Sequence, residues 1–552
     1  MKKVIIILLL CFIIVSIGGY IAFKVYLAPS EEVASYSDEL YLIIEENSFR
    51  KEEAVIFIED VLYFSLPIIK EYLDPNIFYD EEEHTLIITN KDKVNRYKIG
   101  DDIATVNNRE FFLNNVVREI NNNIYVPVDR LLKHYDISVD YFEETNAVVL
   151  DFNNILYLQG ETLSQDSAIR RDRDRKSPII KSNLSQDTIL YIYAEYDGWY
   201  KVRTLDGILG YIEKKDIRIN HTKDIFKSEI PKKDDNSDLE KRIINLTWDY
   251  TYGKVTNTDN IKELKGVNVI SPTWFSINNE EGEVLDKGNI DYVKKYNDLG
   301  YEIWALIDND FNPDLTHKLL SKSSMREKII KDVLKIYKDY GFQGINIDFE
   351  NVHLKTKDYL TQFVRELYPL FKEANMHVSM DITGISQSEN WSMFYDRKRL
   401  QETVDYMILM AYDQHWANSP VAGAVAEYPW VEKSVLGVLK YIPNNKLILA
   451  VPFYTRVWKE ENNKVSSRAL TMEGVNKFIY EKNIQLKWDE NLHQFYGEVK
   501  KEDIKYRIWL EDINSLEIKA SLIHKYDLAG IASWRKGYET MEVWEKLDGA
   551  IN

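Results

Sequence analysis

Eight apolar segments recur through residues 241–552, and amphipathic segments separate them. Near-continuous apolar strands that alternate with helices are typical of parallel strands buried on both faces. Eight such strands in this length predict an α/β fold, a (β/α)8 barrel. The long gap before the last segment predicts a small inserted α+β piece, at roughly 466–512. The expected strands are 243–248, 267–271, 302–308, 344–350, 377–383, 404–413, 446–454 and 528–535.

The fourth expected strand carries polar residues at alternate positions, Asn346, Asp348 and Glu350. Residues two apart in a strand point to the same face, so the two carboxylates should be neighbours. Their repulsion raises the pKa of one of them and keeps a proton available near neutral pH. A general acid for cleaving a glycosidic bond can be made in this way. The alternative is a plain buried strand that ends in a solvated Asp-x-Glu.

Polar and aromatic residues also end other expected strands. Tyr412 and Asp413 end the sixth strand, Trp534 ends the eighth, Arg456 follows the seventh, and Trp274 follows the second. The active sites of such barrels lie at the C-terminal ends of the strands. Each residue has an ordinary alternative, such as a helix N-cap for Asp413. Their shared position predicts one mouth with polar and aromatic groups, as a sugar site requires.

The fourth strand resembles the signature Asp-Gly-x-Asp-x-Asp-x-Glu of glycoside hydrolase family 18, the chitinase and N-acetylglucosaminidase family. Asp348 and Glu350 match its last two acids, whereas Gln343 and Asn346 stand where the first two would be. Met-x-Tyr-Asp at 410–413 and the terminal Trp534 are further family landmarks. The run that ends at His415 and Trp416 is closest to the bacterial spore and cell-wall branch. The resemblance extends over all of residues 241–552.

The resemblance implies a substrate-assisted, retaining mechanism, in which the sugar's 2-acetamido oxygen attacks its own anomeric carbon. Glu350 would protonate the leaving oxygen and later activate water. Asp348 would orient the acetamide N–H and stabilise the oxazolinium-like charge. Tyr412 would donate to the acetamide oxygen, and Trp534 would form the floor under the ring. Further expected substrate contacts are Asp413, Asn346, Trp416, Arg456 and Trp274. The resemblance implies no cofactor and no metal.

Asn346 is the most important difference between this strand and the family signature. In the family, the Asp at this position helps the residue equivalent to Asp348 to change partners during the cycle. An Asn forms hydrogen bonds but cannot share a proton, so we expect an altered pH profile. The alternative is a non-catalytic carbohydrate-binding or envelope-interaction protein on the same barrel. The retained Asp348, Glu350 and Tyr412 favour an enzyme over this alternative.

The N-terminus has two lysines and then an uncharged run from Val4 to Phe23. This run is long enough to span a bilayer. We expect residues 1–28 to be an uncleaved, single-pass anchor with the remainder outside the cytoplasm. The alternative is a cleaved secretory signal, which would also export the chain. The single cysteine, Cys11, lies inside the run, so the exported part has no disulfides.

Residues 31–155 contain a repeat, because the pattern at 63–73 returns at 124–133. This region resembles the N-terminal domain of copper amine oxidases, and we expect a stalk that is dispensable for chemistry. Residues 156–225, with Gly-Trp-Tyr and Gly-Tyr pairs, resemble a bacterial Src-homology-3-like domain, a small all-β barrel. Such domains often bind cell-wall peptides, and many are spacers instead. A polar linker is expected at 226–240, before the catalytic domain at 241–552.

The expected partners follow from this layout and from charge. The net charge of −19 argues against nucleic acid, because phosphate binding needs basic surface. The anchor, the stalk and the wall-type module favour peptidoglycan as the glycan, with chitin or a chitooligosaccharide second. The residues alone do not separate these two polymers.

Overall fold

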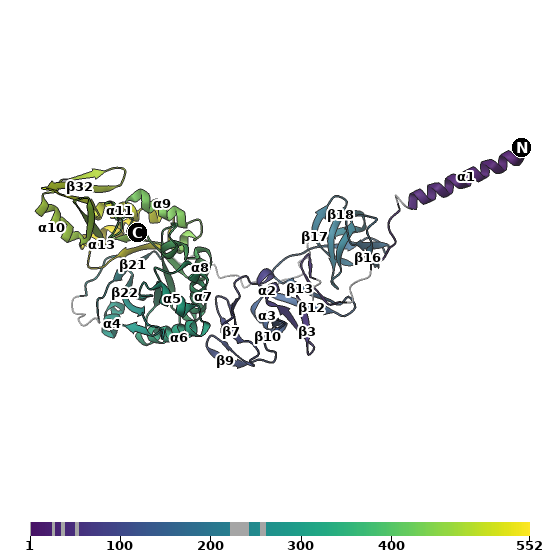
Figure 1. Cartoon of the computed structure of the whole chain (residues 1–552), viewed down its shortest axis with the longest axis horizontal. Coiled ribbons are helices and arrows are strands. Elements are labelled where there is room, and N and C mark those ends of the chain that lie inside the picture. Colours follow the sequence, from purple (N-terminus) through teal and green to yellow (C-terminus); the bar gives the residue numbers. More distant parts are fainter. Residues whose placement is uncertain (1, 25–27, 35–38, 50–53, 221–241, 254–260) are drawn as a thin grey trace. The chain divides into compact units, whose positions relative to one another are not determined.

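The computed structural model describes residues 2–24, 28–34, 39–49, 54–220, 242–253 and 261–552. The predicted linker at 226–240 lies outside the described residues. The chain divides into two compact units, shown in Figure 1. One comprises residues 1–77, 97–104 and 112–236, and the other comprises residues 78–96, 105–111 and 237–552.

The second unit contains the predicted barrel. Eight parallel strands of the described residues pair in chain order, and the first closes on the last through Ile244–Gly530 and Thr247–Ser533. A short antiparallel strand, β23 (Val284–Asp286), extends β22. The fold class is therefore confirmed. The barrel strands are β21 (Ile244–Asp249), β22 (Val269–Ile277), β24 (Glu302–Asp308), β25 (Gly344–Asp348), β26 (His377–Thr383), β27 (Tyr406–Met410), β28 (Leu447–Pro452) and β34 (Gly530–Trp534).

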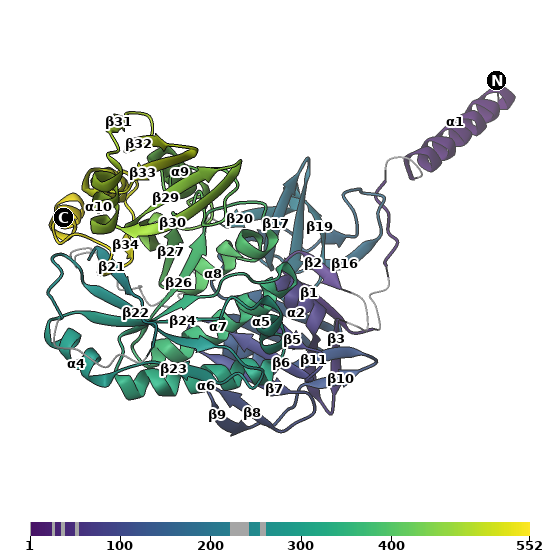
Figure 2. The same cartoon turned by 60° about the vertical axis from the view of Figure 1, so that its left-hand side comes forward.

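Side chains from these strands form two cores, as expected for strands buried on both faces. Leu246, Trp304, Leu306 and Ile408 belong to a small cluster inside the barrel. The alternate residues belong to a larger cluster beneath the helices, which lie outside the strands (Figure 2). The helices are α4 (Ile290–Asp298), α5 (Pro313–Leu320), α6 (Ser323–Tyr340), α7 (Lys357–Glu373), α8 (Arg397–Thr403), α9 (Tyr428–Val438), α11 (Ile513–Ala520), α12 (Leu522–Lys525) and α13 (Glu542–Ile551).

The insertion between β28 and β34 is an antiparallel sheet with one helix, in the order β30-β29-β33-β32-β31. It begins at Tyr454, earlier than the predicted 466, because β28 continues almost directly into β29 without a strong breaker. The continuous apolar pattern of both strands therefore predicts one strand that ends at 454. Its elements are β29 (Tyr454–Glu461), β30 (Lys464–Thr471), α10 (Met472–Lys482), β31 (Leu486–Asp489), β32 (Gln494–Lys501) and β33 (Ile504–Leu510).

In the first unit, the two copies of the repeat each form a strand followed by a short helix. Strands β4 (Val61–Ser65) and β11 (Asn123–Pro127) pair antiparallel with each other. Each leads into a helix with a proline at or next to its first residue, where the missing N–H costs no hydrogen bond. The other elements are α2 (Leu66–Tyr72), α3 (Val128–His134), β1 (Tyr41–Ile44), β2 (Asn47–Phe49), β3 (Val55–Ile58), β10 (Arg118–Ile120), β12 (Ile137–Phe142) and β13 (Ala147–Phe152).

The Src-homology-3-like region is all-β, as predicted, with its strands in the order β16-β15-β19-β18-β17-β14-β20. The strands are β14 (Leu158–Thr162), β15 (Ser167–Arg170), β16 (Ile179–Leu184), β17 (Ile189–Tyr196), β18 (Trp199–Thr204), β19 (Leu209–Glu213) and β20 (Ile217–Asn220).

Helix α1 (Lys2–Ala22) contains Val4–Ala22, whose mean hydropathy of 3.0 and length suit a membrane span.

A five-stranded sheet follows the first copy of the repeat, and residues 78–96 and 105–111 of this segment belong to the barrel unit. Ile87 and Val94 are fully buried in the outer core of the barrel unit. The strands are β5 (Phe78–Asp80), β6 (Thr85–Thr89), β7 (Val94–Lys98), β8 (Ile103–Val106) and β9 (Arg109–Phe112).

Candidate active site

Three aspartates lie at one level on neighbouring barrel strands. Asp308 of β24 pairs with Asp348 of β25, and the register Ile347–Met380 places Asp381 of β26 beside Asp348. Paired residues of parallel strands point to the same face. That face is the barrel interior, because Leu306, two residues before Asp308, belongs to the inner cluster.

Glu350 lies just beyond the end of β25 and is partly exposed. The buried side chain of Asn309 holds the backbone of Glu350 from both sides. It accepts a hydrogen bond from the Glu350 N–H at 3.0 Å and donates one to the Glu350 carbonyl at 2.9 Å. The Tyr395 hydroxyl donates to the carbonyl of Phe349 at 3.0 Å. These contacts fix the direction in which the Glu350 carboxyl leaves the strand.

The surroundings of these acids favour their protonated forms. Burial, followed by the charges of Asp413 and Asp308, raises the pKa of Glu350 to about 7. Burial and the charges of Glu350, Asp381 and Asp308 raise the pKa of Asp348 well above its ordinary value. The charge of Glu350 helps to raise the pKa of Asp348, and the pKa of about 7 of Glu350 would suit a general acid near neutral pH.

Asn346 lies one level below Asp348 and is fully buried. Its side-chain oxygen accepts from the indole N–H of Trp248 at 2.8 Å and from the Ser271 hydroxyl at 3.3 Å. Its amide group donates to Ser379 at 3.2 Å and to Asp381 at 2.8 Å. The predicted substrate contact is therefore corrected: Asn346 supports the layer beneath the site and offers no surface to a sugar.

Tyr412 and Trp534 lie at the mouth, as predicted, and both are partly exposed. The ring centroid of Trp534 is 5.8 Å from that of Trp248 and 6.2 Å from that of Tyr250. Burial and the nearby Asp381 raise the pKa of Tyr412, so its hydroxyl keeps its proton. A neutral hydroxyl and an apolar ring are what an acetamide oxygen and a sugar face would need.

Asp413, Arg456 and Tyr454 form one cluster beside Tyr412. The Asp413 carboxylate accepts from the Tyr454 hydroxyl at 2.6 Å and from the Arg456 guanidinium at 2.9 Å. Asp413 adopts φ 56°, a conformation that Asp tolerates better than most residues. The two predicted residues are therefore brought together, and Tyr454 joins them.

Trp416 is 54% exposed at the mouth, on the loop after β27. Other exposed aromatic side chains stand on loops that follow barrel strands, namely Tyr252, Phe311 and Trp391. His415 bonds to the carbonyl of Ala424 through its Nδ1 at 2.9 Å, and this contact ties it to the backbone of the same loop.

Trp274 was predicted to contact the substrate, but in the structure it lies away from the mouth. It is fully buried, and its ring packs against Tyr292, Tyr340 and Phe342 on the helix side of β22. An irregularity in the pairing of β22 with β24 lies between Thr273 and Phe275. Strand-end position alone therefore misplaced Trp274, because it did not say which face the residue takes.

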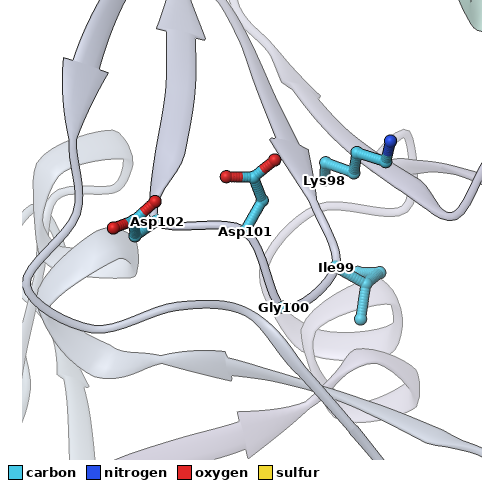
Figure 3. Close-up of a pocket in the computed structure, with 5 residues that line it drawn as sticks. All are labelled: Lys98, Ile99, Gly100, Asp101 and Asp102. Atoms are coloured by element: carbon cyan, nitrogen blue, oxygen red, sulfur yellow. The ribbon is translucent and has the colours of Figure 1, made fainter.

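Among the described residues, no group of three or more His, Cys, Asp or Glu has an arrangement that could hold a metal ion. Figure 3 shows a surface hollow lined by Lys98, Ile99, Gly100, Asp101 and Asp102. Lys98 ends β7 and the other four residues form the turn to β8, where Asp101 caps the backbone N–H of Ile103. This hollow is the surface of a turn and is not a candidate site.

Sequence reasoning did not single out Asp308, Asp381, Asn309 or Tyr454. A signal was present for two of them. Asp308 ends the third expected strand, and Asp381 is a lone acid inside the fifth, at the same level as Asp348. Comparing neighbouring strands level by level would have found both, whereas the contacts of Asn309 and Tyr454 depend on loop geometry.

Comparison with known proteins gives three domain matches. Residues 313–539 match the model of glycosyl hydrolases family 18, residues 43–150 match the copper amine oxidase N-terminal domain, and residues 165–218 match the bacterial SH3 domain. The family 18 match begins after β24, so it covers less than the resemblance predicted for all of 241–552. The three kinds of domain occur in the predicted order.

Curated relatives agree with these matches. The chain is 22% identical over 324 residues to the uncharacterized glycosylase YvbX of Bacillus subtilis, covering 56% of this chain and 92% of that protein. It is 24% identical over 256 residues to a cortical fragment-lytic enzyme of Bacillus subtilis, covering 45% of this chain and 59% of that protein. The solved spore cortex-lytic enzyme SleL of Bacillus megaterium shares the fold, with a TM-score of 0.51, 17% identity and coverage of 57% of this chain and 75% of that one.

The barrel, with Asp348 and Glu350 at the end of β25 and Trp534 at its mouth, is therefore that of a glycoside hydrolase. Residues 313–539 match the model of glycosyl hydrolases family 18 over most of this barrel.

Proposed function

We propose that this protein is a membrane-anchored, extracytoplasmic glycosidase that hydrolyses β-1,4-linked N-acetylglucosamine glycans. It acts with retention of configuration and with assistance from the substrate's own acetamido group. The observation that carries this proposal is the pair Asp348 and Glu350, in which burial and like charges raise both pKa values. Such a pair provides a proton donor beside a second carboxyl group, as this chemistry requires.

The proton balance of the reaction follows from these positions. Protonated Glu350 gives its proton to the leaving glycosidic oxygen while the acetamido oxygen forms a bond to the anomeric carbon. Asp348 accepts a hydrogen bond from the acetamide N–H and stabilises the positive charge of the bicyclic intermediate. Glu350, now a carboxylate, takes a proton from water, whose oxygen attacks the same carbon and restores the acetamide. Glu350 ends protonated again.

Tyr412 and Trp534 have supporting roles in this proposal. Tyr412 donates its hydroxyl proton to the acetamido oxygen, and Trp534 lies under the sugar ring. Asp413 and Arg456, which bond to each other, contact the sugar's hydroxyl groups. Exposed Trp416 and the other aromatic side chains on the strand-end loops support binding of several sugar units, because aromatic faces stack on sugar rings.

Peptidoglycan is the favoured polymer, and chitin or a chitooligosaccharide is second. Support comes from the similarity to a cortical fragment-lytic enzyme and from the bacterial SH3 match. Helix α1 supports a single-pass anchor, with the cell-wall glycan as the main partner of the exported domains and the membrane as the partner of the helix. No nucleic-acid partner is proposed for a chain of this net charge.

The test is to incubate the full-length protein in detergent with purified peptidoglycan and, separately, with chitooligosaccharides. Mass spectrometry of the products should show new N-acetylglucosamine reducing ends, and a plain β-1,4-glucan should remain intact because it lacks the acetamido group. Glu350→Gln is the control, and it should bind without cleaving. Efficient cleavage of the plain glucan would contradict the assisted mechanism.

The second candidate is a non-catalytic carbohydrate-binding or envelope-interaction protein. The specific observation in its favour is Asn346, which replaces an acid of the family signature and is locked by four hydrogen bonds. Binding of peptidoglycan without any new reducing ends, equal in the unmodified chain and in Glu350→Gln, would establish this alternative.

A further inference from the structure

The carboxylate that Asn346 lacks is present on the neighbouring strand. Asp381 of β26 is buried, and its Oδ1 accepts the Asn346 amide at 2.8 Å. The register of β25 and β26 places Asp381 at the level of Asp348, whereas Asn346 lies one level lower. Residues paired in this way have neighbouring side chains on one face.

The orientation of the Asn346 side chain is fixed by one partner that can only donate a hydrogen bond. The Trp248 indole N–H only donates, so it must face the Asn346 oxygen. The amide N–H groups must then face Ser379 and Asp381. Asn346 thus offers a neutral donor to Asp381, while an aspartate at position 346 would have accepted from Trp248 but repelled Asp381.

Two carboxyl oxygens on these neighbouring strands are left without partners. Asp381 Oδ2 and Asp348 Oδ1 are both buried, and neither has a hydrogen-bond partner among the described residues. An unpartnered buried oxygen is costly. One proton between two neighbouring carboxyl groups gives each an interaction that neither has as a bare anion.

The charged and titratable groups around the pair add no compensating cation. Within the described part of the chain, no ion pair includes Asp348, Asp381 or Glu350. Arg456 is already paired with Asp413. The surrounding groups on other elements are acids and hydroxyls: Asp308 of β24, Glu350 after β25, Tyr395 before α8, Tyr412 and Asp413 after β27, and Tyr454 of β29.

We propose that Asp381 is a positioning residue that shares a proton with Asp348 and so supplies, from β26, the carboxyl function missing at Asn346. The inference rests on the proposed glycosidase function and deepens it. In the free enzyme the proton lies between the two carboxyl groups. When the acetamide N–H hydrogen-bonds to Asp348, the proton stays on Asp381, and Asp348 is the anion that stabilises the developing positive charge. Only this proton moves, from one carboxyl oxygen to another.

The test uses a swap that preserves the hydrogen bonds. Asp381→Asn removes the shared proton and keeps the shape. The double variant Asn346→Asp with Asp381→Asn reverses the pair, because an aspartate at 346 still accepts from Trp248 and from the new amide at 381. Asp332→Asn, on the exposed face of α6, is the matched control for an Asp-to-Asn change.

We expect Asp381→Asn to lower kcat on the order of 10–100-fold with little change in KM, as replacement of orienting residues commonly does. The double variant should recover about tenfold of this loss, because the two sites are coupled. Wild-type kcat and an unchanged pH profile in Asp381→Asn would overturn the inference. So would a double variant no better than Asp381→Asn.

A second readout does not depend on turnover. Burial raises the pKa of Asp381, so its proton is held more tightly in the folded state than in the unfolded state. The stabilisation is complete below the unfolded-state pKa and is lost as pH rises through the folded-state pKa. The unfolding temperature of Asp381→Asn should therefore fall less between pH 5 and 8 than that of the unmodified chain, and an equal fall would overturn the inference.

These readouts separate the inference from the function. If the unmodified chain cleaves glycan and Asp381→Asn is equally active, the inference fails and the function stands. If the unmodified chain only binds glycan, the proposed function fails, and the pH dependence of unfolding alone decides whether the proton is shared. Should Asp381→Asn not fold, Asn346→Asp gives the same test, because a further buried acid should steepen the loss of stability with rising pH.

Discussion

Two glutamates in the barrel unit show how differently one side chain behaves in two places. Glu350 lies at the mouth, where its charged neighbours are the acids Asp413 and Asp308, and its pKa is raised to about 7. Glu366, on α7, is fully buried on the outer side of the barrel. Burial alone would raise its pKa, but Arg326 and Arg96 lower it below its ordinary value.

The difference teaches that burial does not decide whether a carboxyl group is charged; the partners do. Glu366 accepts from Arg326 Nε at 3.1 Å and from Gln362 at 2.9 Å, and it also pairs with Arg96. A fully paired carboxylate is fixed as an anion and joins segments of chain. An unpaired one beside other acids keeps a proton that it can give away.

The largest effect that tests this comparison is on catalysis. Glu350→Gln keeps the shape and removes the titrating proton, so turnover should fall by about 10²–10⁴-fold. Stability should not fall, because the folded state already disfavours the charged form of Glu350. Glycan cleavage and thermal unfolding of the same preparation check both statements. Full activity in this variant would contradict the assignment of the acid.

The same substitution at Glu366 should have the opposite outcome. Glu366→Gln leaves Arg326 buried without its counter-ion and leaves Arg96 only the longer contact with Glu327 at 3.7 Å. Breaking such a buried pair costs about 3–5 kcal/mol. Activity per folded molecule should be unchanged. Because the pKa of Glu366 is lowered, its contribution is present above the unfolded-state pKa and is lost as pH falls through the folded-state pKa. Denaturant unfolding at pH 7 and at acid pH should show the difference shrinking towards low pH.

A smaller effect concerns the pH profile. The acid form of Glu350 is the active one in the first step, so kcat/KM should fall as pH rises through about 7. Asp308→Asn removes a neighbouring negative charge, lowers the pKa of Glu350 and moves this fall to lower pH by one unit or less, roughly. The amide oxygen can still accept from Ser276 and from the Asp310 N–H. An unmoved profile would show that Asp413 and burial are enough to raise the pKa of Glu350 without Asp308.

The sequence was enough to predict the barrel, because eight apolar segments with intervening amphipathic helices leave few alternatives. It also predicted Asp348, Glu350, Tyr412, Asp413, Trp534 and Arg456 at the mouth, since strand period and strand ends fix level and face. It failed for Trp274, where an irregular strand changes the face. It did not predict Asp381, because the pattern of one strand does not reveal a residue at the same level of its neighbour; that signal emerges only when adjacent strands are compared.

The packing of residues 78–96 on α6 was also beyond the sequence. Asp80 and Glu83 accept hydrogen bonds from the Ser323 and Ser324 N–H groups, which have no partner within the first turn of the helix. We expected the stalk to be dispensable for chemistry, and that remains a prediction. A chain that begins near residue 241 would nevertheless lose these caps and Arg96, so its activity should be compared at equal amounts of folded protein.

The smallest effect distinguishes two arginines that join residues 78–96 and 105–111 to α7. Arg96 is 7% exposed and pairs with fully buried Glu366, whereas Arg109 is 79% exposed and pairs with Glu373, which is 40% exposed. Solvent screens the second pair, and exposed ion pairs contribute about 0–1 kcal/mol. Arg109→Met should therefore change the denaturation midpoint little, while Arg96→Met should lower it clearly, because Glu366 would keep only Arg326. Adding salt should reduce the already small effect at Arg109 and leave the effect at Arg96 nearly unchanged, since buried pairs are screened less. Equal midpoints for the two variants would mean that the buried cluster holds the segment no more strongly than a surface contact does.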